Sequence, residues 1–154
     1  MEADLRKVPI DTSRSASYGW YASNPTSPDG VVLKILLADD NEQFRRRLCA
    51  LLQRESAFEL VGDAADGEEV VRLARELKPD VVIIDVVMPR LNGIGATRRI
   101  TSEFPSIQVI ALSMHGDAGF RIAMLEAGAS IYILKDNVFH ELPKVLGAIA
   151  AGFA

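Results

Sequence analysis

From Val31 onward, short apolar runs alternate with amphipathic stretches, and this alternation constrains the fold more than any other feature. Five runs are too short for typical helices and rich in strand-forming residues: 33–38, 58–62, 81–84, 109–112 and 131–134. The stretches between them place apolar residues at helical spacing, for example Phe44, Leu48, Leu51 and Leu52. Strands that are apolar nearly throughout and alternate with helices predict an α/β fold, a five-stranded parallel sheet with helices on both faces.

Residues at the ends of the helical patterns predict where the helices begin and stop. Asn41, Asp66 and Asp117 stand where N-caps belong. Gly128 follows a helical pattern and predicts a C-terminal stop.

Residues 1–30 differ in composition from the rest of the chain. Small polar residues, Pro and Gly are closely spaced there, which is typical of a flexible N-terminal extension. The aromatic cluster at 18–21 leaves open a segment that docks on the domain or on a partner. Residues 31–152 are then expected to form one domain, as the length of 154 residues suggests.

Composition excludes several classes of protein. The net charge of -4 gives the surface no electrostatic reason to bind nucleic acid directly. No stretch approaches the roughly 20 apolar residues that span a bilayer, and residues 1–10 lack the apolar core of a signal peptide. The single cysteine, Cys49, allows no internal disulfide and fits a reducing compartment. We therefore expect a cytoplasmic protein without membrane contact.

Polar residues directly follow four of the five predicted strands. The first strand ends in Asp39 and Asp40, and the third ends in Asp85. The fourth runs into Ser113 and the fifth into Lys135. Ligand sites of open parallel sheets form beyond the carboxyl ends of the strands. We expect these three carboxylates, one hydroxyl and one ammonium to converge on one rim of the sheet.

The chemistry of such a group is restricted by its charge. Three carboxylates at close range repel one another, and the single positive charge of Lys135 cannot balance them. A hard divalent cation resolves the conflict, and oxygen ligands favour Mg²⁺. Asp39 and Asp40 would serve the metal, one directly and the other through water.

A carboxylate beside a metal ion can act as a nucleophile and form an aspartyl phosphate. Asp85 follows the strand expected nearest the middle of the sheet, so we expect it to be the phosphoacceptor. Lys135 and Ser113 would each contact one phosphoryl oxygen. Taken singly, an Asp after a strand is commonly an N-cap and a Lys there is usually a solvated charge, but their joint occurrence favours a site.

The chain resembles a response-regulator receiver domain over residues 32–152. The resemblance is carried by LADDN at 37–41, IDVVMPRLNG at 84–93, ALSMH at 111–115 and GASIYILKD at 128–136. It implies a flavodoxin-like (CheY-like) doubly wound sheet with strand order 2-1-3-4-5. It also implies phosphoryl transfer from a sensor histidine kinase to Asp85, with Mg²⁺ held by Asp40, Asp85 and the backbone carbonyl of Val87.

The resemblance further implies a two-state switch. Ser113 would move toward a phosphoryl oxygen and Tyr132 would turn inward, which changes the surface of the fourth helix, fifth strand and last helix. A static strand aromatic is the alternative interpretation of Tyr132. Such a domain is a signalling module rather than an enzyme, because it catalyses only its own phosphorylation and dephosphorylation.

Two details are similar to receivers of the NarL/FixJ/LuxR-type transcription factors: Asp136 directly after Lys135, and the motifs at 113–115 and 128–130. Those proteins carry a C-terminal helix-turn-helix domain, through which alone DNA contact and control of transcription are expected. The sequence ends at Ala154, about where the linker would begin. An excised receiver, a natural single-domain receiver and a regulator that lost its output domain remain open. Receivers of this subfamily often pair, so a homodimer is a further hypothesis.

The same residues bear on other functions. A receiver-like module that binds partners without phosphorylation, or a stand-alone phosphorelay receiver, stays open. Binding of FMN is disfavoured because the acidic loop at 39–42 would repel a phosphate. A metal-dependent phosphatase would be expected to have a second Asp two residues after Asp39, where the sequence has Asn41.

Overall fold

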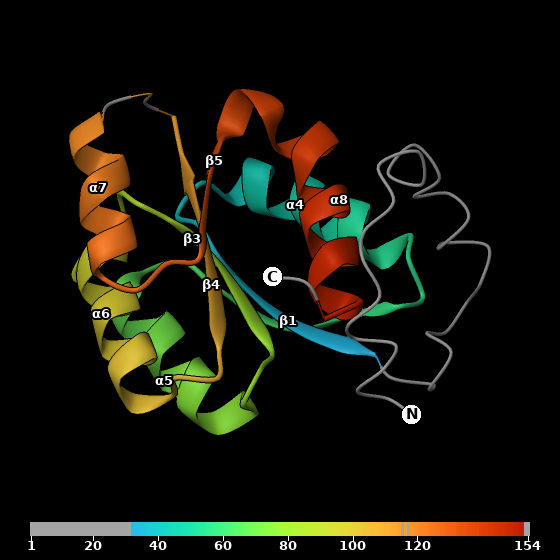
Figure 1. The fold of residues 1–154 in the computed structure, drawn as a ribbon, viewed down its shortest axis with the longest axis horizontal. Helices are drawn as coiled ribbons and strands as arrows, with labels where there is room; N and C mark the ends of the chain where they lie inside the picture. The colour runs from blue at the N-terminus through green and yellow to red at the C-terminus, as the bar shows by residue number, and fades with distance from the viewer. Residues whose placement is uncertain (1–31, 115, 117, 153–154) are drawn as a thin grey trace.

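The computed structural model describes residues 32–114, 116 and 118–152 (Figure 1). Within them, five parallel strands form one sheet in the order β2-β1-β3-β4-β5, which confirms the predicted order. The strands are β1 (Leu33–Ala38), β2 (Phe58–Ala64), β3 (Val81–Asp85), β4 (Gln108–Ser113) and β5 (Ile131–Leu134). The predictions made for residues 1–30 and Asp117, and residue 115 of the motif at 111–115, lie outside the described residues.

Helices cover both faces of this sheet, as predicted. They are α4 (Glu42–Gln53), α5 (Gly67–Leu77), α6 (Gly93–Glu103), α7 (Ala118–Glu126) and α8 (Val138–Ala150), with a 3-10 turn η1 (Lys135–Asn137) before α8. Figure 1 shows α5, α6 and α7 on one side of the sheet, and α4 and α8 on the other. No helix in the described part of the chain is long and apolar enough to cross a membrane.

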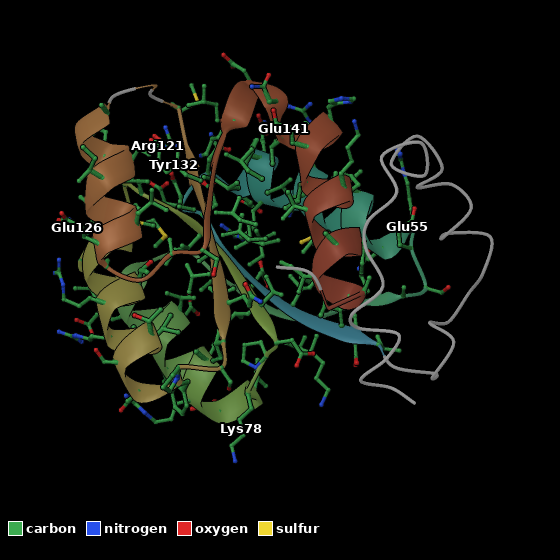
Figure 2. The ribbon with its side chains drawn as sticks, viewed as in Figure 1. Glu55, Lys78, Arg121, Glu126, Tyr132 and Glu141 are labelled. Carbon is green, nitrogen blue, oxygen red and sulfur yellow. The ribbon has the colours of Figure 1, made fainter. Side chains whose placement is uncertain are left out.

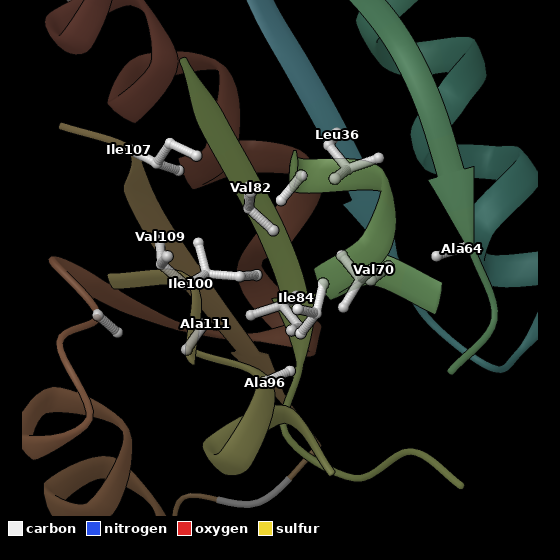
Figure 3. Close-up of a cluster of buried hydrophobic side chains, with 14 of the residues drawn as sticks. Leu36, Ala64, Val70, Val82, Ile84, Ala96, Ile100, Ile107, Val109 and Ala111 are labelled. Carbon is white, nitrogen blue, oxygen red and sulfur yellow. The ribbon is translucent and has the colours of Figure 1, made fainter. Parts of the chain in front are cut away.

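The core consists of two apolar layers, one on each face of the sheet. Side chains alternate between the faces along each strand, so Leu36 and Ile84 join the layer under α5, α6 and α7. Ile35 and Ile83 join the layer under α4 and α8. Figure 3 shows the first layer, in which strand residues pack against Val70 and other helical residues. Because both faces are buried, the strands read as continuous apolar runs.

Helix boundaries follow the predicted caps where the structure describes them. The side chain of Asn41 accepts a hydrogen bond from the Phe44 amide at 2.9 Å, and that of Asp66 accepts one from the Glu69 amide at 2.8 Å. Gly128 lies just beyond α7 with φ +114°, where a Cβ would also collide with the Thr101 side chain. These three predictions are confirmed.

Other boundaries were not predicted. Asn92 caps α6 through the Gly95 amide at 2.9 Å. Lys78 ends α5 in the left-handed conformation, at φ 49°, where glycine is more usual; its side chain points away from the molecule in Figure 2. Strand β2 continues to Ala64, beyond the predicted end at residue 62. Its backbone remains paired with β1 although Asp63 interrupts the apolar pattern.

Candidate functional site

The strand register places the predicted site residues on one edge of the sheet. Asp85 is the last residue of β3, beside Leu112 of β4, so Ser113 lies one step further along. Ser113 in turn pairs with Leu134 of β5, and Lys135 follows directly. Asp39 follows β1, the other neighbour of β3. The central strand therefore carries Asp85, as the sequence predicts.

Three carboxylates gather at this edge. Asp39, Asp40 and Asp85 each offer an oxygen atom, and these atoms lie within 4.8 Å of one another. Asp39 and Asp85 are buried, at 0% and 6% exposure, whereas Asp40 is exposed. The group is thus closed on the protein side and open to solvent at Asp40.

Lys135 supplies the nearest positive charge. Its ammonium nitrogen Nζ lies 2.7 Å from Oδ2 of Asp39 and 3.3 Å from Oδ2 of Asp85. The lysine side chain is itself only 9% exposed. One partly buried ammonium is therefore shared between two buried carboxylates, and Asp40 adds a third negative charge at the opening.

The pKa of Asp85 reflects this excess of negative charge. Its pKa is raised from 3.8 to about 6, first by burial and then by the charge of Asp39. The ammonium of Lys135 and a hydrogen bond with the Val87 backbone lower the pKa again, but only in part. The protein alone therefore does not supply enough positive charge to balance the ionised carboxylate of Asp85.

The raised pKa predicts a stabilising substitution. The folded chain still holds the Asp85 proton between about pH 4 and pH 6, where the unfolded chain has released it. Stability conferred by this group is therefore lost as the pH rises through that window. We expect Asp85→Asn to raise the free energy of unfolding of the metal-free protein by about 1–3 kcal/mol at about pH 7.5.

Urea unfolding in a chelating buffer measures this difference across the pH range. The advantage of Asp85→Asn should shrink as the pH falls toward 4, because the folded wild-type carboxyl is then protonated and no longer carries a buried charge. Glu59→Gln is the control, since Glu59 is an exposed acid near the start of β2, at the opposite end of the sheet. An amide at residue 85 that destabilises at neutral pH would contradict the prediction.

The donor set fits a hard divalent cation. Oδ1 of Asp39 accepts the Asn41 amide at 2.8 Å. Buried Oδ2 has no hydrogen-bond partner among the described groups, so its close contact with Lys135 is an ion pair without good hydrogen-bond direction. Three carboxylates with an unsatisfied buried oxygen and one open side match what Mg²⁺ binds. Metal binding by Asp39, Asp40 and Asp85 remains a prediction, as does the Val87 carbonyl as a ligand.

The loop after Asp85 is held close to the site by backbone contacts. The Val86 amide donates to the Leu112 carbonyl at 3.0 Å, and the Gly93 amide donates to the Val86 carbonyl at 2.8 Å. A Cβ on Gly93 would collide with the Asp85 carbonyl oxygen. Glycine at the start of α6 therefore lets this helix pack directly against the end of β3.

Sequence reasoning missed two residues that contact the site. Arg45 donates to the Asp39 carbonyl at 2.6 Å and pairs with Asp63 at 2.7 Å, which ties the end of β1 to the end of β2. The ring of Phe44 lies beside Lys135. The sequence places both residues in the first turn of the helix after the acidic pair. Nothing in the spacing, however, says which neighbours they meet.

The two proposed switch residues, Ser113 and Tyr132, lie on the neighbouring strands β4 and β5. Ser113 is 1% exposed at the end of β4. Tyr132, on β5, is partly buried against the core layer under α5, α6 and α7. Figure 2 labels Tyr132 at β5, on the α7 side. These positions suit the predicted roles, and the movements themselves remain predictions.

Comparison with known proteins identifies the family. A family description for the response regulator receiver domain matches residues 35–146. The chain belongs to this family. This receiver is 36% identical over 122 residues to the transcriptional regulatory protein DegU of Brevibacillus brevis, which covers 79% of this chain and 52% of DegU. The receiver thus spans about half the length of the curated relatives it matches.

Solved structures of similar proteins share the fold. A LuxR-family two-component response regulator from Aurantimonas is 36% identical, with a TM-score of 0.74 over 79% of this chain and 86% of that one. The isolated receiver domain of RcsB from Salmonella enterica, solved in the presence of phosphomimetic BeF₃⁻, is 26% identical. Its TM-score is 0.72, over 79% of this chain and 90% of that one. The flavodoxin-like fold and the resemblance to NarL/LuxR-type regulators are confirmed.

Proposed function

We propose that this receiver is a phosphorylation-dependent switch in which Asp85 accepts a phosphoryl group from a sensor histidine kinase. The observation that carries the proposal is the position of Asp85. It is a buried carboxylate on the central strand, 3.3 Å from the Lys135 ammonium and within 4.8 Å of two further acidic side chains. This is a geometry that positions a nucleophile and concentrates charge for phosphoryl transfer.

The transfer assigns a task to each residue. An Asp85 carboxylate oxygen attacks phosphorus of the phosphohistidine, an O–P bond forms, the N–P bond breaks, and the histidine ring leaves and takes up a proton. The Lys135 ammonium shifts from the Asp85 carboxylate toward a phosphoryl oxygen, and the Ser113 hydroxyl contacts another. A bound Mg²⁺ would neutralise charge on the carboxylates and the phosphoryl group. Asp39, Asp40 and Asp85 would hold it, together with the Val87 carbonyl.

The signalling output follows from a shift between two conformations of the domain. The new negative charge favours the arrangement in which Ser113 and Tyr132 have moved inward, and the surface of α7, β5 and α8 changes with them. The α7 helix presents Ile122 and Leu125 to solvent at 54% and 40% exposure, so apolar area is available there for a partner or a second copy. DegU is a transcriptional regulatory protein, and we propose the same output here, through a DNA-binding domain outside these residues.

Phosphorylation by a small donor tests the proposal without knowledge of the kinase. We expect the protein to gain the mass of one phosphoryl group when incubated with acetyl phosphate and Mg²⁺, as intact-mass spectrometry would show. Chelation of Mg²⁺ by EDTA should slow the gain at least about 100-fold, because the carboxylates then repel the incoming phosphoryl group. The proposal fails if no gain occurs with Mg²⁺ present.

The alternative is a protein-interaction module that binds partners without being phosphorylated. Intact-mass spectrometry distinguishes it from the proposed switch, because such a module would gain no phosphoryl mass. A stand-alone phosphorelay receiver would show the gain but would pass the group on to a histidine of a second protein. A cytoplasmic location and a homodimer belong to the same proposal.

A further inference from the structure

Phe44, in the first turn of α4, lies against Lys135, the partly buried lysine of the site. The ammonium nitrogen of Lys135 is 4.5 Å from the centroid of the Phe44 ring and lies over its face. The same nitrogen is 2.7 Å from Asp39 and 3.3 Å from Asp85. Two carboxylates and one aromatic face therefore surround the ammonium.

The ring is held in turn by the packing of α4 against α8. Phe139 of α8 meets Phe44 edge to face, with centroids 5.9 Å apart and planes at 71°. The guanidinium carbon of Arg47 lies 4.6 Å from the centroid of the Phe139 ring. Each of the two rings thus has a cation over one face, and the Phe44 ring packs between Lys135 and Phe139 of α8.

An aromatic face suits this position for a physical reason. The ring attracts a cation, yet it cannot take a proton from the ammonium and adds no net charge. A third carboxylate there would bind Lys135 and compete with the phosphoryl group for it. Leucine would fill the space but exert no directed attraction. The ring leaves the ammonium free to move between Asp85 and an arriving phosphoryl oxygen.

We propose that Phe44 is a positioning residue for Lys135, which acts through a cation–π contact to keep the ammonium beside Asp85. The role rests on the proposed phosphoryl transfer, which it deepens. Loss of the contact should slow phosphorylation of Asp85 without unfolding the domain, because other side chains of the layer under α4 and α8 still fill the core.

Two substitutions at residue 44 distinguish the attraction of the ring face for the ammonium from the effect of the shape of the ring. Phe44→Leu removes the aromatic face and is expected to slow phosphorylation by acetyl phosphate about tenfold at saturating Mg²⁺. Replacement of Phe44 by 3,4,5-trifluorophenylalanine keeps the shape and apolar character but weakens the negative potential of the ring face, and should slow it about threefold. Phe104→Leu and the same fluorinated residue at Phe104 are the controls, since Phe104 packs on the opposite face of the sheet.

Nuclear magnetic resonance tests the contact itself in the unphosphorylated protein. The side-chain methylene protons next to Nζ of Lys135 should show an upfield ring-current shift that Phe44→Leu abolishes and Phe104→Leu preserves. A fluorinated variant that reacts at the wild-type rate, or Lys135 protons with no ring-current shift, would overturn the proposal. If the wild-type protein gains no phosphate at all, the proposed function fails, and the resonance measurement alone decides whether the ring holds the lysine.

Discussion

Asp85→Asn is expected to abolish phosphorylation by acetyl phosphate, with a loss of at least about 1000-fold in rate. An amide oxygen is a poor nucleophile, and the substitution also removes one of the negative charges that would hold the metal ion. The fold should survive, because the amide avoids the cost of ionising a buried group whose pKa is raised to about 6. Failure of the variant to react could therefore not be blamed on unfolding.

Intact mass measured at several times after addition of acetyl phosphate and Mg²⁺ checks this expectation. Asp80→Asn makes the same chemical change at an exposed residue before β3 and should react at the wild-type rate. A mass gain in Asp85→Asn that approaches that of the wild type would place the phosphoryl group elsewhere and contradict the assignment.

Loss of Mg²⁺ binding is the second large effect that we expect. Simultaneous Asp40→Asn and Asp85→Asn substitutions remove two of the three carboxylates of the acidic group. The Lys135 charge stays in place and would then repel a divalent cation. We expect Mg²⁺ affinity, measured by isothermal titration calorimetry, to fall at least about 100-fold.

The matched control for this experiment changes the net charge equally at the other end of the sheet. Glu59→Gln and Asp80→Asn together neutralise two exposed acids near the starts of β2 and β3. Their effect on Mg²⁺ affinity should stay within about threefold, because charges more than a Debye length away are largely screened at physiological salt. Equal loss in both double variants would show that only overall charge matters.

Much of the fold was predictable because its determinants are local. The alternation of apolar runs with helical patterns reflects strands buried on both faces, as Ile35 and Leu36 show by pointing to opposite layers. Asn41 and Asp66 cap helices through bonds three residues along the chain, so their sequence context is sufficient. Lys78 was not predictable as a left-handed helix end, because glycine is the residue usually found in that conformation.

The site was predictable to the extent that it is built from strand ends. Parallel strands bring their carboxyl ends to one edge, and so Asp39, Asp85 and Lys135 could be placed together without coordinates. Arg45 and Phe44 approach the site from the side of a helix, and their partners depend on how that helix packs against its neighbours. Helical periodicity gives the face on which a residue lies but does not identify the atom it meets.

Chemical trapping of the phosphorylated residue tests the central claim most directly. Borohydride reduces an aspartyl phosphate to homoserine, which peptide mass mapping can locate after treatment of the wild-type protein with acetyl phosphate and Mg²⁺. The account predicts homoserine at Asp85, formed only when Mg²⁺ is present during phosphorylation. Homoserine at Asp39, Asp40 or any other acidic residue in place of Asp85, or at Asp85 regardless of Mg²⁺, would contradict it.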